Sequence, residues 1–418
     1  APEALAQLPY LTLADGADFS ATADQLAGSL FGGSLFPWLA MLYWMGHPTV
    51  RAPQGVTFGL TFLLAFVFGS IPAAISAGAL FGVSLADADW LHGAAESLLA
   101  ITNCIVVLGF RDGLSAAEDR TPRLRTAAII LGGLSALSAL VVPILGATAV
   151  HTPWLGGIGN LPPSLWPDEP ANALSVPTWV IHTSSLVEWL VAMGLSWRYA
   201  DATSRPEWKG VTWGMLPLHT SGIVACTYHL FYNAEAVSWC VVLQAAMTCL
   251  GNTTLAIACL RLAMASGWTW ADIGRDAAAA LTFAGGDGSE QVESEGEFRP
   301  QTDREIQPPE TGGVPALTDA SVPDTASSLV GWEDLGDTWA ADGDLAFLAK
   351  LALLSTTLAY AAKYLPALTP APLVQAWQEV PNEALSAVAL AVIVVPTLLN
   401  CAKWIQRSEA DAEFLGDF

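Results

Sequence analysis

Long apolar runs recur along the whole chain, and they restrict its fold more than any other feature. Each carries about 20 predominantly apolar residues, the length that an α-helix needs to cross the roughly 30 Å hydrocarbon layer of a bilayer. Backbone in lipid must satisfy its own hydrogen bonds, so such runs form helices. We therefore expect an all-α, polytopic membrane protein with about nine transmembrane helices, at residues 26–46, 57–82, 90–110, 126–149, 178–198, 211–231, 237–264, 346–366 and 383–403.

Charged residues are scarce, which supports a membrane location and excludes one class of partner. Only 13% of the 418 residues are Asp, Glu, Lys or Arg, and 53% are hydrophobic, whereas a typical soluble chain carries about 25% charged residues. The net charge of −23 opposes binding to the phosphates of nucleic acids. We expect lipids and other integral membrane subunits as partners, and no nucleic acid.

The basic residues predict an orientation. With nine alternating spans, 15 of the 16 Lys and Arg residues fall on one side of the membrane, and Lys363 is the exception. Loops rich in Lys and Arg stay on the cytoplasmic side of most membranes. The N-terminus is therefore expected outside and the C-terminus inside.

One stretch differs in composition from the rest of the chain. Residues 266–345 hold 17 Asp and Glu against three Arg. An acidic segment of this kind cannot bury a core, so it predicts a long, mostly disordered linker on the basic side. The expected units are a four-helix membrane part at 1–150, a three-helix part at 151–265, the linker, and a two-helix part at 346–418.

Ionisable side chains inside a membrane span are costly, and function is their default explanation; six of those in the predicted spans are candidates. A helix rises about 1.5 Å per residue, which places three of the histidines at one outer level and one Glu–His pair near mid-membrane. The candidates are His92, His182 and His229 at the outer level with Glu96 beside them, and Glu188 and His219 near the middle.

Several chemistries could use these side chains. One imidazole can ligate the magnesium of a chlorophyll, haem more often needs two facing histidines, and zinc or copper needs three or four converging ligands. Glu188 with His219 could relay protons, and helix-to-helix hydrogen bonds need no ligand at all. Gly93 would leave room for a macrocycle beside His92, and Trp189 could stack on its ring. Walker, His-Glu-x-x-His and Gly-x-Ser-x-Gly motifs are absent from the sequence, so we expect no enzyme.

Two stretches resemble uncharacterised membrane families of phototrophs. Residues 178–264, with the elements HTSS, WGMLPLH and YHLFYN, resemble the family called hypothetical chloroplast reading frame forty-nine. Residues 35–111, with the core DADWLHGAAESLLAITNCIVVLGFR, look like a second plastid and cyanobacterial family. The resemblance implies an oxygenic phototroph and a chloroplast thylakoid membrane, with the N-terminus in the lumen and the linker and C-terminus in the stroma. It implies no activity.

Together these observations predict a non-enzymatic subunit of a thylakoid photosynthetic complex, with photosystem I favoured. Such a subunit would bind chlorophyll and carotenoid and link the core to the antenna. The six candidate side chains would ligate chlorophyll magnesium, and no other metal is expected. A transporter of ions or small solutes is the alternative, because prolines interrupt several spans. A photosystem assembly factor, which recruits a basic stromal protein through the acidic linker, is another.

Overall fold

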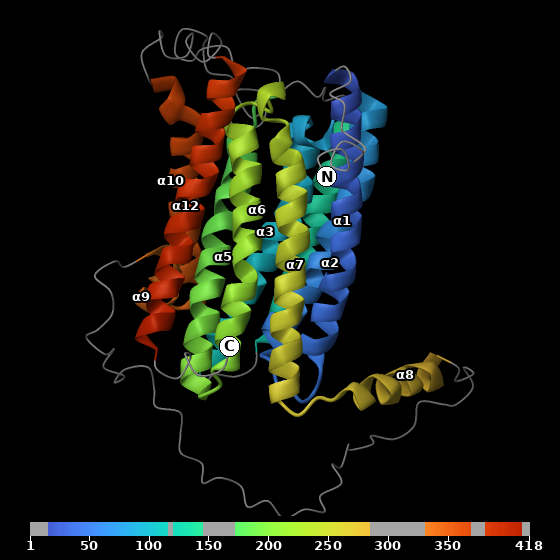
Figure 1. Ribbon diagram of the computed structural model, residues 1–418, viewed down its shortest axis with the longest axis vertical. Helices are drawn as coiled ribbons and strands as arrows, with labels where there is room; N and C mark the ends of the chain where they lie inside the picture. Colours follow the sequence, from blue (N-terminus) through green and yellow to red (C-terminus); the bar gives the residue numbers. More distant parts are fainter. Residues whose placement is uncertain (1–15, 116–119, 145–171, 285–330, 369–380, 412–418) are drawn as a thin grey trace, which may run out of the picture.

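The computed structural model describes residues 16–115, 120–144, 172–284, 331–368 and 381–411, and most of these are helical. Long helices run side by side in a bundle, and α8 projects sideways from one end of it (Figure 1). The helices are α1 (Gly16–Gly46), α2 (Gln54–Ser76), α3 (Asp89–Leu114), α4 (Thr121–Ile144), α5 (Val176–Thr203), α6 (Glu207–Leu230), α7 (Trp239–Ala265), α8 (Trp270–Ala284), α9 (Leu335–Thr338), α10 (Asp344–Leu368) and α12 (Asn382–Ala410).

Seven helical segments of the described residues are long and apolar enough to cross a membrane. They are Gln25–Gly46, Gln54–Phe81, Asp89–Leu114, Thr121–Leu140, Glu235–Ala265, Asp344–Tyr364 and Asn382–Ala410. They coincide with seven of the nine predicted spans, so the chain is a polytopic membrane protein whose described part is an all-helical fold. The other two predicted spans form α5 and α6, which do not meet the same criterion. Most residues of both helices are buried against their neighbours, which explains why they tolerate more polar side chains.

Helix α5 lies inside the bundle and contacts α3, α6 and α10. Helix α3 packs on α2 and α4, while α6 packs on α7 and α12, and α7 packs on α1. Glycines permit the closest of these approaches, between α2 and α3: a Cβ atom on Gly55 would lie 2.7 Å from the Cα of Gly109. Large side chains, among them Trp208, Phe110 and Met41, are almost fully buried. The bundle therefore holds the inner faces of α3, α5 and α6 in fixed positions.

The structure shows helices near both ends of the predicted acidic linker, residues 266–345. Helix α8 occupies the start of residues 266–345, and a short helical stretch at 332–338 that includes α9 lies near the end. The intervening residues 285–330 lie outside the described part of the chain. Basic side chains of α5 and α12 pair with the acids of the last stretch: Arg198 with Asp337, Lys403 with Glu333, and Arg407 with Asp334. These cations partly neutralise the acidic stretch and attach it to α5 and α12.

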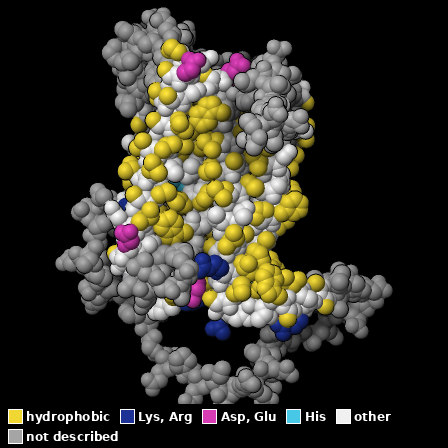
Figure 2. All heavy atoms as spheres, in the orientation of Figure 1, with side chains coloured by type: hydrophobic (Ala, Val, Ile, Leu, Met, Phe, Trp, Pro, Cys, Tyr) yellow, Lys and Arg dark blue, Asp and Glu magenta, His cyan; other side chains and the backbone are white. Residues whose placement is uncertain are grey.

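Hydrophobic side chains cover the middle of the visible face, and Lys and Arg gather toward its lower end (Figure 2). The most exposed apolar residues include Ile129 and Leu140 on α4, as expected for a helix that faces lipid. Lys363, the exception in the predicted charge distribution, is buried, and its Nζ donates a hydrogen bond to the Leu174 carbonyl oxygen at 2.6 Å. A buried and hydrogen-bonded lysine is tolerated at that position.

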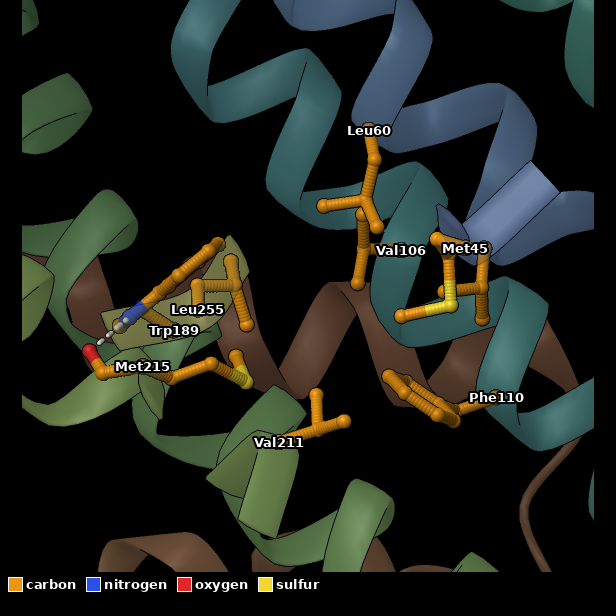
Figure 3. Close-up of a pocket in the computed structure, with 9 residues that line it drawn as sticks. Met45, Leu60, Val106, Phe110, Trp189, Val211, Met215 and Leu255 are labelled. Carbon is orange, nitrogen blue, oxygen red and sulfur yellow. Dashed lines mark hydrogen bonds between the residues drawn. The ribbon is translucent and has the colours of Figure 1, made fainter. Parts of the chain in front are cut away.

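Side chains from α1, α2, α3, α5, α6 and α7 surround a small apolar void (Figure 3). Its volume is only about 10 Å³, about the space that one water molecule needs, so it is a packing defect and not a binding site. On its edge, the Trp189 indole donates a hydrogen bond to the Met215 carbonyl oxygen at 3.0 Å. This bond accounts for a tryptophan in the middle of a predicted span.

Candidate metal centre

Three of the predicted histidines converge at one end of the bundle: His92 from α3, His182 from α5 and His229 from α6. The Nε2 atoms of His92 and His182 are 2.9 Å apart, and the ring centroids of the three pairs are 4.9 to 5.0 Å apart. One ring nitrogen of each lies within 4.8 Å of the other two. All three side chains are buried, with at most 8% exposed. We call this group the tri-histidine centre.

Asp89 places two of these histidines opposite each other. It is the first residue of α3, where a carboxylate interacts favourably with the helix dipole. Its Oδ1 accepts the backbone N–H of Ser175, which precedes α5, at 2.8 Å. The Thr178 hydroxyl donates to the Asp89 carbonyl oxygen at 3.3 Å. Because these bonds tie the two helix starts together, His92 and His182 meet within the first two turns of their helices.

The third histidine is oriented by a chain of hydrogen bonds. His229 lies in the last turn of α6, and its Nδ1 donates to the Asn233 Oδ1 at 2.9 Å. The amide nitrogen of Asn233 donates to Asp87 Oδ1 at 2.7 Å, and Ser84 donates to the other Asp87 oxygen at 2.6 Å. Since Asn233 presents an oxygen, the proton of His229 is on Nδ1. Its Nε2 lone pair is therefore free for the tri-histidine centre.

The hydrogen bonds of the tri-histidine centre leave one of its ring nitrogens without a partner. A neutral imidazole offers one N–H and one lone pair, and among the three rings one short hydrogen bond, between His92 and His182, uses a proton. The Nδ1 of His92 is buried without a hydrogen-bond partner. A tetrahedral ion with metal–nitrogen bonds of about 2.0–2.1 Å would place its nitrogen ligands about 3.3 Å apart. The spacing found here, between 2.9 and 4.8 Å, brackets that value.

The structure does not bring the other predicted site residues into the tri-histidine centre. Glu96 lies one helical turn further along α3 from His92. Glu188 accepts a hydrogen bond from the Cys104 thiol on α3 at 3.2 Å. His219 has its partner on α12, where its Nδ1 lies 3.3 Å from the Asn400 amide nitrogen. Glu188 and His219 thus have partners on different helices, which does not favour the predicted relay between them.

Two features that suggested room for a macrocycle have other structural roles. Gly93 allows α3 to approach α5, since a Cβ atom there would lie 2.6 Å from the Thr178 hydroxyl oxygen. Trp189 directs its indole N–H to Met215 of α6 and belongs to the hydrophobic core. Both residues therefore contribute to helix packing.

Sequence reasoning missed the residues that support the histidines. Asp87 and Asp89 stand five and three residues before His92, and Asn233 stands four residues after His229. These spacings fall in the motifs DADWLH and YHLFYN. The spacing of His229 and Asn233 could have indicated their contact, because side chains four residues apart lie on the same side of a helix end. The pairing of Cys104 with Glu188 had no signal in either span alone.

Comparisons with known proteins match the two segments that supply these histidines. A family described as protein of unknown function (DUF2499) matches residues 173–261, and another, protein of unknown function (DUF3593), matches residues 27–115. The first segment contains α5 and α6, and the second contains α3. The tri-histidine centre therefore lies between the two matched segments. No solved structure matches the chain.

Two curated relatives match the first of these segments. A Ycf49-like protein of Synechocystis is 48% identical over 87 residues, which are 21% of this chain and 84% of the relative. The uncharacterized protein ycf49 of Cyanophora paradoxa is 31% identical over 84 residues, which are 20% of this chain and 82% of that relative. This chain belongs to the Ycf49-like family and joins its DUF2499 domain to a DUF3593 domain.

Proposed function

We propose that this membrane protein binds one transition-metal ion at the tri-histidine centre. The observation that carries the proposal is the convergence of three buried imidazoles from three helices. The support of His229 by Asn233 and Asp87 adds to it. Metal-bound histidines commonly donate their second N–H to a carbonyl or carboxylate oxygen, which fixes the tautomer and the ring orientation.

The donor atoms indicate the class of metal. Imidazole nitrogens suit zinc, copper, nickel and iron, whereas magnesium and calcium prefer oxygen ligands. Three protein ligands leave the fourth position of a tetrahedral ion open to water or to another ligand. The open position lets the ion exchange or take a further ligand, and the function that we propose is metal binding.

We also propose that α5 and α6 cross the bilayer, which gives nine spans. Both helices pack among helices that meet the criterion for a span, and both have comparable length (Figure 1). The gathering of Lys and Arg toward one end (Figure 2) supports an orientation with that end in the stroma and the tri-histidine centre near the lumen. Relatives from Synechocystis and Cyanophora support a thylakoid location.

The predicted subunit of a photosynthetic complex, with photosystem I favoured, is the second candidate. The exposed apolar side chains of α4, including Ile129 and Leu140, support packing against lipid or another integral membrane subunit. Chlorophyll ligation through Nε2 of His92 or His182 would require these rings to separate, because the two atoms face each other. Chlorophyll and carotenoid binding is tested by the same purification as metal binding.

The test is the metal and pigment content of the full-length chain, purified from membranes in mild detergent. We expect about one transition-metal ion per chain and its loss in the His182→Ala variant. Elemental analysis by mass spectrometry measures the metal, and an absorption spectrum of the same sample measures pigment.

His219→Ala is the matched control. It also removes a buried imidazole from the bundle, but one whose partner is Asn400 on α12. The control should keep the metal. Equal metal content in His182→Ala and His219→Ala would refute the metal centre. So would a wild-type protein that contains no metal and whose bound chlorophyll is lost in His182→Ala. Circular dichroism and a single elution volume show that each variant is folded.

A further inference from the structure

A second polar group lies between α3 and α5, deeper in the bundle than the tri-histidine centre. The thiol of Cys104 donates to Glu188 Oε1 at 3.2 Å, and the Asn103 amide nitrogen donates to the Ser185 carbonyl oxygen at 3.4 Å. Cys104 lies twelve residues beyond His92, and Glu188 lies six beyond His182, which correspond to about 18 and 9 Å of helix rise.

Three polar atoms of this group are left without a hydrogen-bond partner. Glu188 Oε2, Asn103 Oδ1 and Ser185 Oγ are buried and have no hydrogen-bond partner. The side chains of Asn103 and Glu188 are only 2% and 4% exposed. Leaving polar atoms unpaired in a protein interior is destabilising, so their retention points to a ligand. Carboxylate, amide and hydroxyl oxygens beside a thiol suit a cation.

Two polar side chains, one on α3 and one on α6, lie one helical turn from the tri-histidine centre along the sequence. Glu96 is one turn beyond His92 on α3, and Cys226 is one turn before His229 on α6. His92, Glu96 and Asn103 follow one another at spacings of four and seven residues, which keeps them on one face of α3. Metal-binding side chains thus continue inward from the histidines.

We propose that Cys104 and Glu188 form a second, mid-membrane site for a thiophilic divalent cation, which is loaded through the tri-histidine centre. The loading step rests on the proposed function, whereas the second site does not. The chain then passes an ion through the outer half of the bilayer, by way of Glu96 and Cys226. Its substrate is the metal ion itself.

The binding step exchanges a proton for the ion. The S–H bond of Cys104 breaks, bonds form from the divalent ion to Sγ and to a Glu188 carboxylate oxygen, and the thiol proton leaves to water. If the carboxyl group holds a proton, that proton leaves as well. No electron is transferred. Asn103 and Ser185 supply the neutral oxygens that complete the set of ligands.

Cadmium is the probe, because its bond to a thiolate produces an ultraviolet charge-transfer band. The full-length chain in detergent is mixed with Cd²⁺ alone, and the amplitude and rate of the band are recorded. We expect a band in the wild type and its loss in both Cys104→Ala and Glu188→Gln. The second variant keeps the side-chain shape, so it carries the test if Cys104→Ala does not fold. Cys259→Ala, at a buried thiol on α7, should keep the band.

The two parts of the proposal fail separately. A band of unchanged amplitude in Glu188→Gln, with Cys104→Ala unfolded or also unchanged, overturns the second site. For the loading step, we expect His182→Ala to reach the wild-type amplitude more slowly. Loading at the wild-type rate would overturn the path from the histidines. The proposed function would not be affected by that result. It is tested separately, by elemental analysis of the metal content of the tri-histidine centre.

Discussion

At the scale of single residues, Asn233 does the most to prepare the tri-histidine centre. Its φ of 55° lies in the left-handed region, which Asn adopts more readily than most residues. Its backbone N–H donates to the Tyr228 carbonyl oxygen and ends α6. This turn brings the Asn233 amide under His229 and leaves its nitrogen facing Asp87. One residue therefore ends a helix and sets the tautomer of a ligand.

Asn233→Ala should weaken metal binding without removing a ligand. Loss of a partner of this kind typically lowers metal affinity by about 10–100-fold, because the His229 ring loses its orientation. Competition titration of the purified chain with a chelator measures the change. Asn252→Ala is the control, since Asn252 is buried and donates to Ser34 at another interface. A similar loss of affinity in both variants would contradict a specific role for Asn233.

The sequence predicted which histidines share a level but not how they are held. His92, His182 and His229 could be placed by helix rise because each lies in a long apolar run with a known direction. The tie between Asp89 and Ser175, and the chain from His229 to Asp87, join residues far apart in the sequence. Such contacts depend on the register between helices, which a single sequence does not specify.

At the scale of elements, α3 is held in place by its close approach to α2. A Cβ atom on Gly59 would lie 2.8 Å from a side-chain carbon of Val106, and one on Gly109 would meet the backbone of Gly55 and Val56. Small residues of this kind let membrane helices pack closely. The position of α3 in turn fixes His92 in the tri-histidine centre.

Gly109→Ala should destabilise the bundle. The added methyl group has no space against α2, and overpacking typically costs about 1–3 kcal/mol. Thermal unfolding in detergent, followed by circular dichroism, should show a lower midpoint. Gly133→Ala on α4 is the control, because a Cβ atom there meets nothing within 4 Å. An unchanged midpoint for Gly109→Ala would show that α2 and α3 are not tightly packed.

The elements themselves were mostly predictable, and the exceptions have a physical reason. Apolar runs located the seven long helices that can span the membrane, together with α5 and α6. The sequence did not predict α8 or the short stretch that includes α9, because α8 has only 15 residues, fewer than a membrane span needs, and the other stretch is shorter still. The latter depends on Arg198, Lys403 and Arg407 from distant helices, so its own sequence carries little signal.

At the scale of the whole molecule, the two-helix tail is attached by contacts and not only by the chain. Helix α10 packs on α5, and α12 packs on α6. The ion pairs between Lys403 and Glu333 and between Arg198 and Asp337 add a second connection at the basic end. The membrane parts should therefore behave as one assembly.

A protease site introduced within residues 285–330 tests this. After cleavage, both fragments should elute together in size-exclusion chromatography in mild detergent, because the helix contacts remain. The same cleavage in the double variant Lys403→Gln, Arg198→Gln should weaken the association. Separation of the fragments in the otherwise unaltered chain would show that the covalent connection alone retains the tail.

The predicted orientation can be tested on sealed, right-side-out thylakoids. Protease added from the stromal side should cut within residues 285–330 and spare residues 150–177, which the charge distribution assigns to the lumen. Permeabilised membranes should expose both regions. Cleavage of sealed membranes confined to 150–177 would reverse the orientation.

The central claim is that three histidines from the two matched segments bind one metal ion. X-ray absorption spectroscopy of the purified, metal-loaded chain tests it most directly. The account predicts one ion per chain with three imidazole nitrogens at about 2.0–2.1 Å, if the ion is zinc, and loss of this signal in His182→Ala. A spectrum without imidazole ligands, or one unchanged by His182→Ala in the folded protein, would contradict it.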